Sequence, residues 1–294
     1  TFFASAEVVS FEGATPVFVD VDERTFNLDP DQLEKAIAVV KQQGKLRPRA
    51  VVAVDLFGQP ADYERIEAIC KEHGLLLLED GAQGFGGSIG ERRACSFGDA
   101  ATTSFFPAKP LGCYGDGGAV FTNDDQLDEL LRSLRVHGKS PVSKYDNVRI
   151  GVNSRLDTLQ AAVLGVKLDA FASYELEAVN RAAQMYSEYL GEATKTPVVP
   201  EGFGSSWAQY TILLKDEAQR QKVQHALKEQ GIPTMVYYPK PMHLQGAFDQ
   251  LEQPVACPVT ESLCQRVVSL PMHPYLSEED IRFVSNAVKA ALEE

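Results

Sequence analysis

Leu75-Leu-Leu-Leu-Glu-Asp-Gly-Ala-Gln83 is the stretch that decides the fold, because four apolar residues run directly into two carboxylates and a glycine. Such a short, continuous apolar run is typical of a buried parallel strand whose carboxyl end opens onto a loop. Ligands of open α/β sheets collect at those carboxyl ends. The stretch therefore predicts a binding site beside Asp80, while Glu79 faces the opposite side of the strand.

Strand-like and helix-like patterns alternate on both sides of this stretch. The expected strands are 15–19, 50–55, 75–79 and 99–104, and the expected helices are 31–42 and 61–72. Repeated βα units of this kind favour an α/β fold with a mostly parallel sheet covered by helices on both faces.

The pattern changes after residue 153. A long helical periodicity covers 154–190, and the expected elements beyond it are a strand at 207–214, a helix at 217–229, a strand at 232–238 and a closing helix at 277–292. We therefore expect a large α/β domain over 1–153, bridging helices over 154–190 and a smaller α+β domain over 191–294.

Composition limits the class of protein. A chain of 294 residues with 44% apolar content can bury a large core. The net charge of −13 speaks against nucleic-acid binding, and no uncharged apolar stretch is long enough to predict a membrane span. Five cysteines without a Cys-x-x-Cys pair indicate reduced thiols rather than a metal site. These features, with no signal peptide pattern, are those expected of a cytoplasmic enzyme.

Lys109 lies in Ser104-Phe-Phe-Pro-Ala-Lys-Pro-Leu-Gly-Cys-Tyr-Gly-Asp-Gly-Gly118, directly after the expected strand 99–104. A lysine attacks a carbonyl only as the free amine, and apolar surroundings lower its pKa. Pro110 disfavours a helix at Lys109, and the glycines let the backbone bend close to a ligand. The setting predicts a lysine that carries a cofactor aldehyde as a Schiff base. A surface lysine beside a glycine-rich hairpin is the alternative.

Asp80 and Gln83 extend this hypothesis to the end of the central strand. A carboxylate at that position can pair with a protonated pyridine nitrogen and keep the ring electron-withdrawing. Asp80 is the candidate for that role, and a helix cap or solvated loop acid is its alternative. Gln83 is a candidate to hydrogen-bond a phenolate oxygen on the same ring, with an ordinary polar loop residue as the alternative.

Four ordered motifs resemble those of the DegT/DnrJ/StrS-type nucleotide-sugar aminotransferases. They are Glu79-Asp-Gly-Ala-Gln83, Ser104-Phe-Phe-Pro-Ala-Lys109, Gly115-Asp-Gly-Gly118 and Gly151-Val-Asn-Ser-Arg155. The resemblance runs from Thr1 to the C-terminus. It implies a fold-type I enzyme that uses pyridoxal 5'-phosphate.

The resemblance assigns roles to individual residues of this chain. Lys109 is implied to bind the cofactor covalently and to move the proton during catalysis, and Asp80 to pair with the ring nitrogen. Gln83 lies near the ring hydroxyl, and Ser104 is a ligand of the cofactor phosphate. Phe2 falls where relatives stack an aromatic side chain on the ring, with a core aromatic at the start of a helix as its alternative.

The resemblance also implies a homodimer with shared active sites. Asn153 matches an asparagine that reaches the phosphate of the neighbouring subunit's cofactor, and Arg155 is then a candidate substrate contact from the same partner chain. Candidate substrate contacts further include His137, Tyr238 and His243. His137 is alternatively a simple helix end, and relatives often have a histidine where this chain has Tyr237, which leaves the roles of Tyr238 and His243 open.

The implied reaction is transfer of an amino group from glutamate to a nucleotide-linked keto-sugar. The sequences around Lys109 and Arg155 most resemble family members that aminate C3 of UDP-2-acetamido-2-deoxy-3-keto-glucuronic acid, a precursor of O-antigen lipopolysaccharide. Arg155 suits the uronate carboxylate, which a guanidinium binds bidentately. The alternatives are a dTDP- or UDP-keto-6-deoxyhexose aminotransferase and a non-catalytic scaffold. A dehydratase is disfavoured, because those relatives replace the lysine by histidine.

The start of the chain departs from the family pattern. Relatives carry, before the part that matches Thr1, a Gly-Thr helix start whose backbone amides bind the cofactor phosphate. We therefore expect that segment to be missing from this chain.

Overall fold

The structure, a computed structural model, describes residues 1–143 and 145–293. Its helices begin and end at residues that suit their positions. α2 (Pro30–Gln43) follows Asp29, whose carboxylate accepts two N–H groups of the first turn, and ends at Gly44 with a φ of 66°. Such caps satisfy the free N–H groups at one end, and glycine takes the left-handed conformation at the other.

A four-stranded sheet in the order β1-β2-β5-β6 forms the centre of the larger part of the molecule. Its strands are β1 (Ala50–Val54), β2 (Leu76–Asp80), β5 (Ala100–Ser104) and β6 (Gly118–Phe121). The first three are parallel and β6 is antiparallel to β5. The α/β fold class is thereby confirmed. The register pairs Val54 with Asp80 and Asp80 with Thr102, so the carboxyl ends of three strands meet at one edge.

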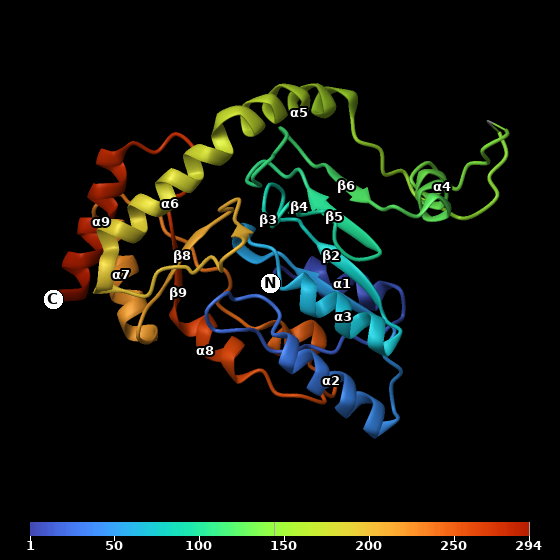
Figure 1. Cartoon of the computed structure of the whole chain (residues 1–294), viewed down its shortest axis with the longest axis horizontal. Coiled ribbons are helices and arrows are strands. Elements are labelled where there is room, and N and C mark those ends of the chain that lie inside the picture. The colour runs from blue at the N-terminus through green and yellow to red at the C-terminus, as the bar shows by residue number, and fades with distance from the viewer. Residues whose placement is uncertain (144, 294) are drawn as a thin grey trace.

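Helices cover this sheet (Figure 1). They are α1 (Ala4–Phe11), α2, α3 (Tyr63–His73) and α5 (Thr158–Ala170), whereas α4 (Asp125–Leu134) lies out beyond β6, away from the sheet. α2 and α3 share a core with β1 and β2, and within it the rings of Tyr63 and Phe97 stack with centroids 4.4 Å apart. α5 shares a separate core with the loop after β5, through Leu164, Leu111 and Cys113. That loop carries Lys109.

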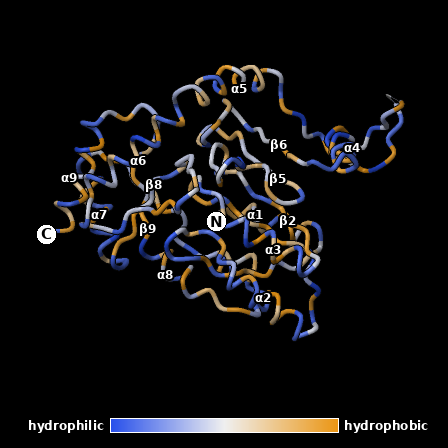
Figure 2. Tube along the Cα trace, viewed as in Figure 1, coloured by the Kyte–Doolittle hydropathy of each residue, from blue (hydrophilic) through white to orange (hydrophobic). Residues whose placement is uncertain are grey.

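A second core lies at the other end of the molecule. It is built from β8 (Tyr210–Leu213), β9 (Val267–Leu270), α6 (Leu176–Leu190), α7 (Glu217–Glu229) and α9 (Glu278–Glu293). β8 and β9 are antiparallel, and their apolar residues stand out in Figure 2. α5 and α6 join through one π-helical turn at Phe171–Glu175 and connect the two cores in Figure 1. The predicted domain boundaries at 153 and 190 stay a prediction.

The remaining β-strands and the remaining α-helix of the described residues are short. They are β3 (Ser88–Ile89), β4 (Arg92–Arg93), β7 (Phe203–Gly204) and α8 (Pro258–Arg266). No helix within residues 1–143 and 145–293 is both long and apolar enough to cross a membrane.

Two predicted strands are wrong. Residues 15–19 have no regular structure, although Val19 packs against the core of α2 and α3. Residues 232–238 form only an isolated bridge between Met235 and Ser269. Both segments have apolar side chains that pack, but a strand also needs a continuous ladder of backbone hydrogen bonds to a neighbour. The predicted helix over 154–190 begins only at Thr158.

Candidate active site

The site forms where β2 and β5 end. The Gly81 N–H donates to the Thr102 carbonyl over 2.8 Å, and the Thr103 hydroxyl donates to the Gly81 carbonyl over 3.0 Å. A Cβ atom added at Gly81 would lie 2.7 Å from the Cys95 Sγ, so the turn after Asp80 packs too closely for a side chain. The turn that carries Asp80 and Gln83 is therefore fixed to the neighbouring strand.

Asp80 is held by one donor on each carboxylate oxygen. The Ser5 hydroxyl, on α1, donates to Oδ2 over 2.6 Å, and the Ala82 N–H donates to Oδ1 over 3.2 Å. A short hydrogen bond to an ionised acceptor is among the stronger kinds in proteins. Asp80 is thus oriented by residues from two separate parts of the chain.

Lys109 lies in a closed loop between β5 and β6. The Phe105 N–H donates to the Gly117 carbonyl over 2.8 Å and the Cys113 N–H to the Phe105 carbonyl over 2.7 Å, while the Lys109 N–H donates to the Phe106 carbonyl over 2.9 Å. Burial lowers the pKa of the Lys109 amine, and the charge of Asp80 partly opposes this. The charge of Asp80 thus acts on the Lys109 amine, and burial makes that amine easier to deprotonate.

Gln83 and Tyr238 lie on the same side of the site. Gln83 is buried; its Oε1 accepts the Phe57 N–H over 2.8 Å, and its Nε2 makes a weak 3.4 Å bond to the Tyr238 hydroxyl. Burial raises the pKa of Tyr238 to about 12, and the nearby charge of Asp80 acts in the same direction. The ring of Phe2 lies 6.4 Å from that of Tyr238 between centroids. The structure thus brings these three residues together with Asp80 and Lys109.

Ser104 ends β5, where it pairs with Gly118 of β6. Its hydroxyl is half-buried and accepts the Phe106 N–H over 3.2 Å. This places a hydroxyl group one strand away from Asp80 and five residues before Lys109. Its role as a phosphate ligand stays a prediction.

His137, Asn153 and Arg155 lie in the segment that connects α4 to α5, and all three are exposed. The Arg155 Nε donates to the Asn153 Oδ1 over 2.9 Å, and the His137 N–H donates to the Val152 carbonyl over 3.0 Å. Within residues 1–143 and 145–293, no hydrogen bond links these three side chains to Asp80, Gln83 or Lys109. Their roles in cofactor and substrate binding stay a prediction.

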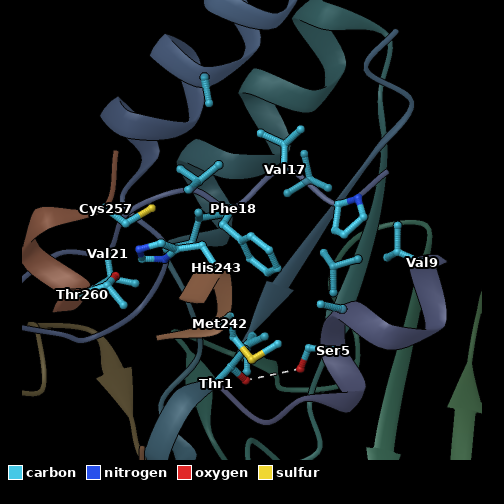
Figure 3. Close-up of a pocket in the computed structure, with 18 of the residues that line it drawn as sticks. Thr1, Ser5, Val9, Val17, Phe18, Val21, Met242, His243, Cys257 and Thr260 are labelled. Atoms are coloured by element: carbon cyan, nitrogen blue, oxygen red, sulfur yellow. Dashed lines mark hydrogen bonds between the residues drawn. The ribbon is translucent and has the colours of Figure 1, made fainter. Parts of the chain in front are cut away.

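His243 lines a cavity of about 630 Å³ beside α1, α2 and β1. In Figure 3 it lies next to Phe18, and the centroids of the two rings are 6.5 Å apart. Its Nε2 lies 3.0 Å from the Glu261 carboxylate of α8. His243 is thus engaged by another side chain, and its role in substrate binding stays a prediction.

Several residues that contact the site were not predicted from the sequence. Ser5 bonds to Asp80, and Asp55 bonds through its N–H to the Asp80 carbonyl over 3.1 Å. Gln160, on α5, accepts the Tyr114 N–H over 2.8 Å and so supports the lysine loop. The only sequence signal for Asp55 is its position at the end of the predicted strand 50–55. Ser5 and Gln160 carry none, because their contacts join segments far apart in the chain.

The residues present fit pyridoxal phosphate. A half-buried lysine with a lowered pKa can bind an aldehyde, an oriented carboxylate can hold a ring nitrogen, and an aromatic side chain lies beside them. Among the described residues there is no cluster of side chains able to hold a metal ion.

Comparisons with known proteins agree with this chemistry. The profile of the DegT/DnrJ/EryC1/StrS aminotransferase family matches residues 1–289. The chain is 43% identical over 289 residues to the UDP-2-acetamido-2-deoxy-3-oxo-D-glucuronate aminotransferase of Pseudomonas aeruginosa, covering 98% of this chain and 76% of that protein. It is 41% identical to the UDP-N-acetyl-3-dehydro-alpha-D-glucosamine 3-aminotransferase of Acidithiobacillus ferrooxidans, covering 99% of this chain and 76% of that one.

Solved structures give the same result. A DegT DnrJ EryC1 StrS aminotransferase from Brucella abortus superposes with a TM-score of 0.94 at 49% identity, covering 99% of this chain and 77% of that one. DesV of S. venezuelae, crystallised with a ketimine intermediate, superposes with a TM-score of 0.91 at 36% identity, covering 100% of this chain and 76% of that one.

Proposed function

Because the chain belongs to the DegT/DnrJ/EryC1/StrS aminotransferase family, it is a pyridoxal phosphate aminotransferase of nucleotide sugars, and we propose that its acceptor is UDP-2-acetamido-2-deoxy-3-keto-glucuronic acid. The observation that carries the chemistry is the half-buried Lys109 amine, whose pKa is lowered by burial and acted on by the charge of the oriented Asp80 carboxylate. When bound, the cofactor supplies an electron sink for the carbon that loses its proton.

Each side chain of this site has its own role in the reaction. Lys109 would hold the cofactor aldehyde through Nζ, and its free amine would take up and return the proton that moves during transfer. Asp80, held by Ser5, keeps a positive charge on the ring nitrogen. Gln83 and Tyr238 present hydrogen-bonding groups beside Asp80. Their fixed positions lower the reorganisation that the reaction requires.

The choice of acceptor rests on relatives and on Arg155. The relatives from Pseudomonas aeruginosa and Acidithiobacillus ferrooxidans are both named for UDP-linked sugars with an oxidised C3 and a nitrogen at C2. Arg155 is exposed, and its guanidinium is free to bind a carboxylate bidentately apart from the bond of Nε to Asn153. These observations favour amination at C3 of a uronic acid over a 6-deoxyhexose. Glutamate as the amino donor and a role in O-antigen synthesis belong to the same proposal.

A dTDP-keto-6-deoxyhexose is the second candidate acceptor. The chain is 38% identical to the dTDP-3-amino-3,6-dideoxy-alpha-D-galactopyranose transaminase of Aneurinibacillus thermoaerophilus, over 98% of this chain and 76% of that one. The two candidates differ at C6, where only the first has a carboxylate.

We further propose a cytoplasmic homodimer with shared active sites. Apolar side chains are strongly exposed on α5 and on the segment before it, including Ile150 at 94%, Leu159 at 80% and Val166 at 74%. Exposed apolar side chains gathered on one segment mark an interaction site, and Asn153 and Arg155 lie on the same segment. All five cysteines are unpaired and buried, as suits a reducing compartment.

The deciding experiment is an assay of the purified protein with glutamate against UDP-2-acetamido-3-keto-glucuronate and keto-6-deoxyhexoses linked to UDP or dTDP. We expect transfer to the uronate to be preferred, and we expect Arg155→Ala to lose about tenfold or more on the uronate alone, since a bidentate carboxylate pair is removed. Lys109→Ala is the control for chemistry, and its activity should fall at least about a hundredfold. Equal activity on the uronate and on the 6-deoxy sugars would contradict the proposal that the uronate is the acceptor.

A further inference from the structure

Two fully buried carboxyl groups lie behind Asp80 and have no part in the chemistry described above. Asp55 directly follows β1 and Glu79 lies on β2, and both side chains are 0% exposed. A buried carboxylate is stable only when hydrogen bonds or opposite charges compensate for its lost hydration. The partners of each carboxyl group therefore show its charge state.

Glu79 has the partners of an ionised carboxylate. Its Oε1 accepts the Cys95 N–H, and its Oε2 accepts the Phe97 N–H over 2.8 Å. Burial raises the pKa of Glu79, while these N–H groups and the charge of Arg92, whose guanidinium lies 4.3 Å from the centre of the Phe97 ring, act in the opposite direction. Both oxygens of Glu79 are thus satisfied as acceptors.

Asp55 has a donor for only one of its oxygens. Its Oδ1 accepts the Tyr63 hydroxyl over 2.8 Å and the Ala61 N–H over 3.3 Å. Its Oδ2 is buried and accepts no hydrogen bond from any of the described residues, while Glu79 is its hydrogen-bonding neighbour. Two ionised carboxylates cannot hydrogen-bond, because both only accept. A proton on Oδ2 satisfies the orphaned atom and supplies the missing donor.

We propose that Asp55 is a positioning residue, held as a neutral carboxylic acid that donates its proton to Glu79, and that this pair fixes the turn carrying Asp80 and Gln83. The evidence for a neutral Asp55 comes only from the contacts of Asp55 and Glu79. The consequence for Asp80 rests on the proposed function.

The pair acts on the turn through two contacts. The Asp55 N–H donates to the Asp80 carbonyl over 3.1 Å. Gly84 packs directly on the Asp55 carboxyl group, so that an added Cβ atom would lie 2.1 Å from Oδ2. A shared proton also leaves the pair with one negative charge instead of two behind Asp80.

The surroundings of Asp55 favour the protonated form. The titratable groups that face it or its partner are Glu79 and Asp80 on β2, Tyr63 on α3, Cys95 in the loop after β4, and Arg92 on β4. Except for Arg92, each is neutral or negative. Burial raises the pKa of Asp55 well above its ordinary value, and the charge of Glu79 raises it further.

The raised pKa of Asp55 makes the stability of the fold fall as the pH rises. A carboxyl group whose pKa is raised on folding takes up a proton when the chain folds. The contribution of this group to the free energy of unfolding is fully present below its pKa in the unfolded chain, about 3.9. That contribution is lost as the pH rises towards the pKa of the group in the folded chain. Asn at position 55 keeps the shape and the donor but has no proton to lose.

The first test compares the pH dependence of unfolding in the parent and in Asp55→Asn between pH 5 and pH 8. We expect the unfolding equilibrium constant of the parent to rise relative to that of Asp55→Asn by about tenfold per pH unit. Asp249→Asn, at an exposed carboxylate, is the matched control and should follow the parent. If the unfolding equilibrium constants of the parent and of Asp55→Asn changed with pH in parallel, the proposal that Asp55 is protonated would be overturned.

The second test measures pyridoxal phosphate binding by absorbance in the same proteins and in Asp55→Leu, which has similar size but no donor. Asp55→Asn should bind within about twofold of the parent, and Asp55→Leu at least about tenfold more weakly. Circular dichroism checks that each variant folds. Loss of binding in Asp55→Asn, or full binding in Asp55→Leu, would overturn the positioning role. A parent that binds no cofactor would defeat the proposed function, while the unfolding comparison would still decide the charge of Asp55.

Discussion

At the residue scale, the properties of Lys109 depend on Asp80. Burial lowers the pKa of the lysine, and the aspartate charge raises it again. The lysine must be partly unprotonated to attack an aldehyde, and it must also return a proton during transfer, so a pKa near the working pH suits both tasks. Ser5 holds the aspartate in place over 2.6 Å.

Asp80→Asn should lower the pKa of Lys109 further, because it removes the charge that opposes burial. The pH dependence of Lys109 acylation in cofactor-free protein, followed by mass spectrometry, measures this shift. Transamination should fall by about a hundredfold to a thousandfold, since the ring nitrogen loses its counter-charge. Asp116→Asn, in the same glycine-rich loop, is the control. If the pH midpoint of Lys109 acylation rose in Asp80→Asn, the result would contradict the interaction between Asp80 and Lys109.

At the element scale, α5 supports the loop that carries Lys109. Leu164 shares a core with Leu111 and Cys113 of that loop. Gln160 accepts the Tyr114 N–H over 2.8 Å, and Gly115 packs against its side-chain amide. The helix thereby adds contacts from outside the loop to the hydrogen bonds within it.

Gln160→Ala should loosen the lysine loop and lower the turnover number by about tenfold, since positioning of reacting groups is sensitive to small displacements. Hydrogen exchange in the loop should increase at the same time. Gln184→Ala, on the exposed face of α6, is the control and should change neither. Unchanged exchange at residues 113–117 would show that α5 does not hold this loop.

At the scale of the whole molecule, the site residues fall into two groups. Lys109 and Asp80 come together within one chain, whereas Asn153 and Arg155 lie on an exposed surface and bond to each other. A twofold dimer would bring the second group of one chain to the first group of the other.

Mixing two inactive variants tests this arrangement. If the sites are shared, Lys109→Ala mixed with Asn153→Ala should recover roughly a quarter of the parent's activity, because half of the dimers are mixed and each has one intact site of two. Lys109→Ala mixed with Asp80→Ala is the matched control and should recover nothing, since both residues belong to the same chain's half of the site. Recovery in neither mixture would place Asn153 outside the partner's site.

Local patterns in the sequence were enough to predict the α/β class, the strand that ends at Asp80 and the loop with Lys109. An apolar run, a proline and a group of glycines act on the backbone within a few residues, so their effect can be predicted without the fold. The strands expected at 15–19 and 232–238 did not form. A strand depends on a neighbour that the local pattern does not specify.

Only the tertiary structure decided which side chains support the site. Ser5 lies 75 positions before Asp80, and Asp55 lies 24 positions before Glu79. Their contacts arise because parallel strands and the helix beside them bring distant segments to one edge of the sheet. The sequence alone determined which side chains are available for the proposed chemistry, since side-chain type is independent of the fold. In the folded chain, burial and neighbouring charges lower the pKa of Lys109 and keep the proton that we infer between Asp55 and Glu79. Both effects require tertiary structure, because desolvation and neighbouring charges exist only once the chain has folded.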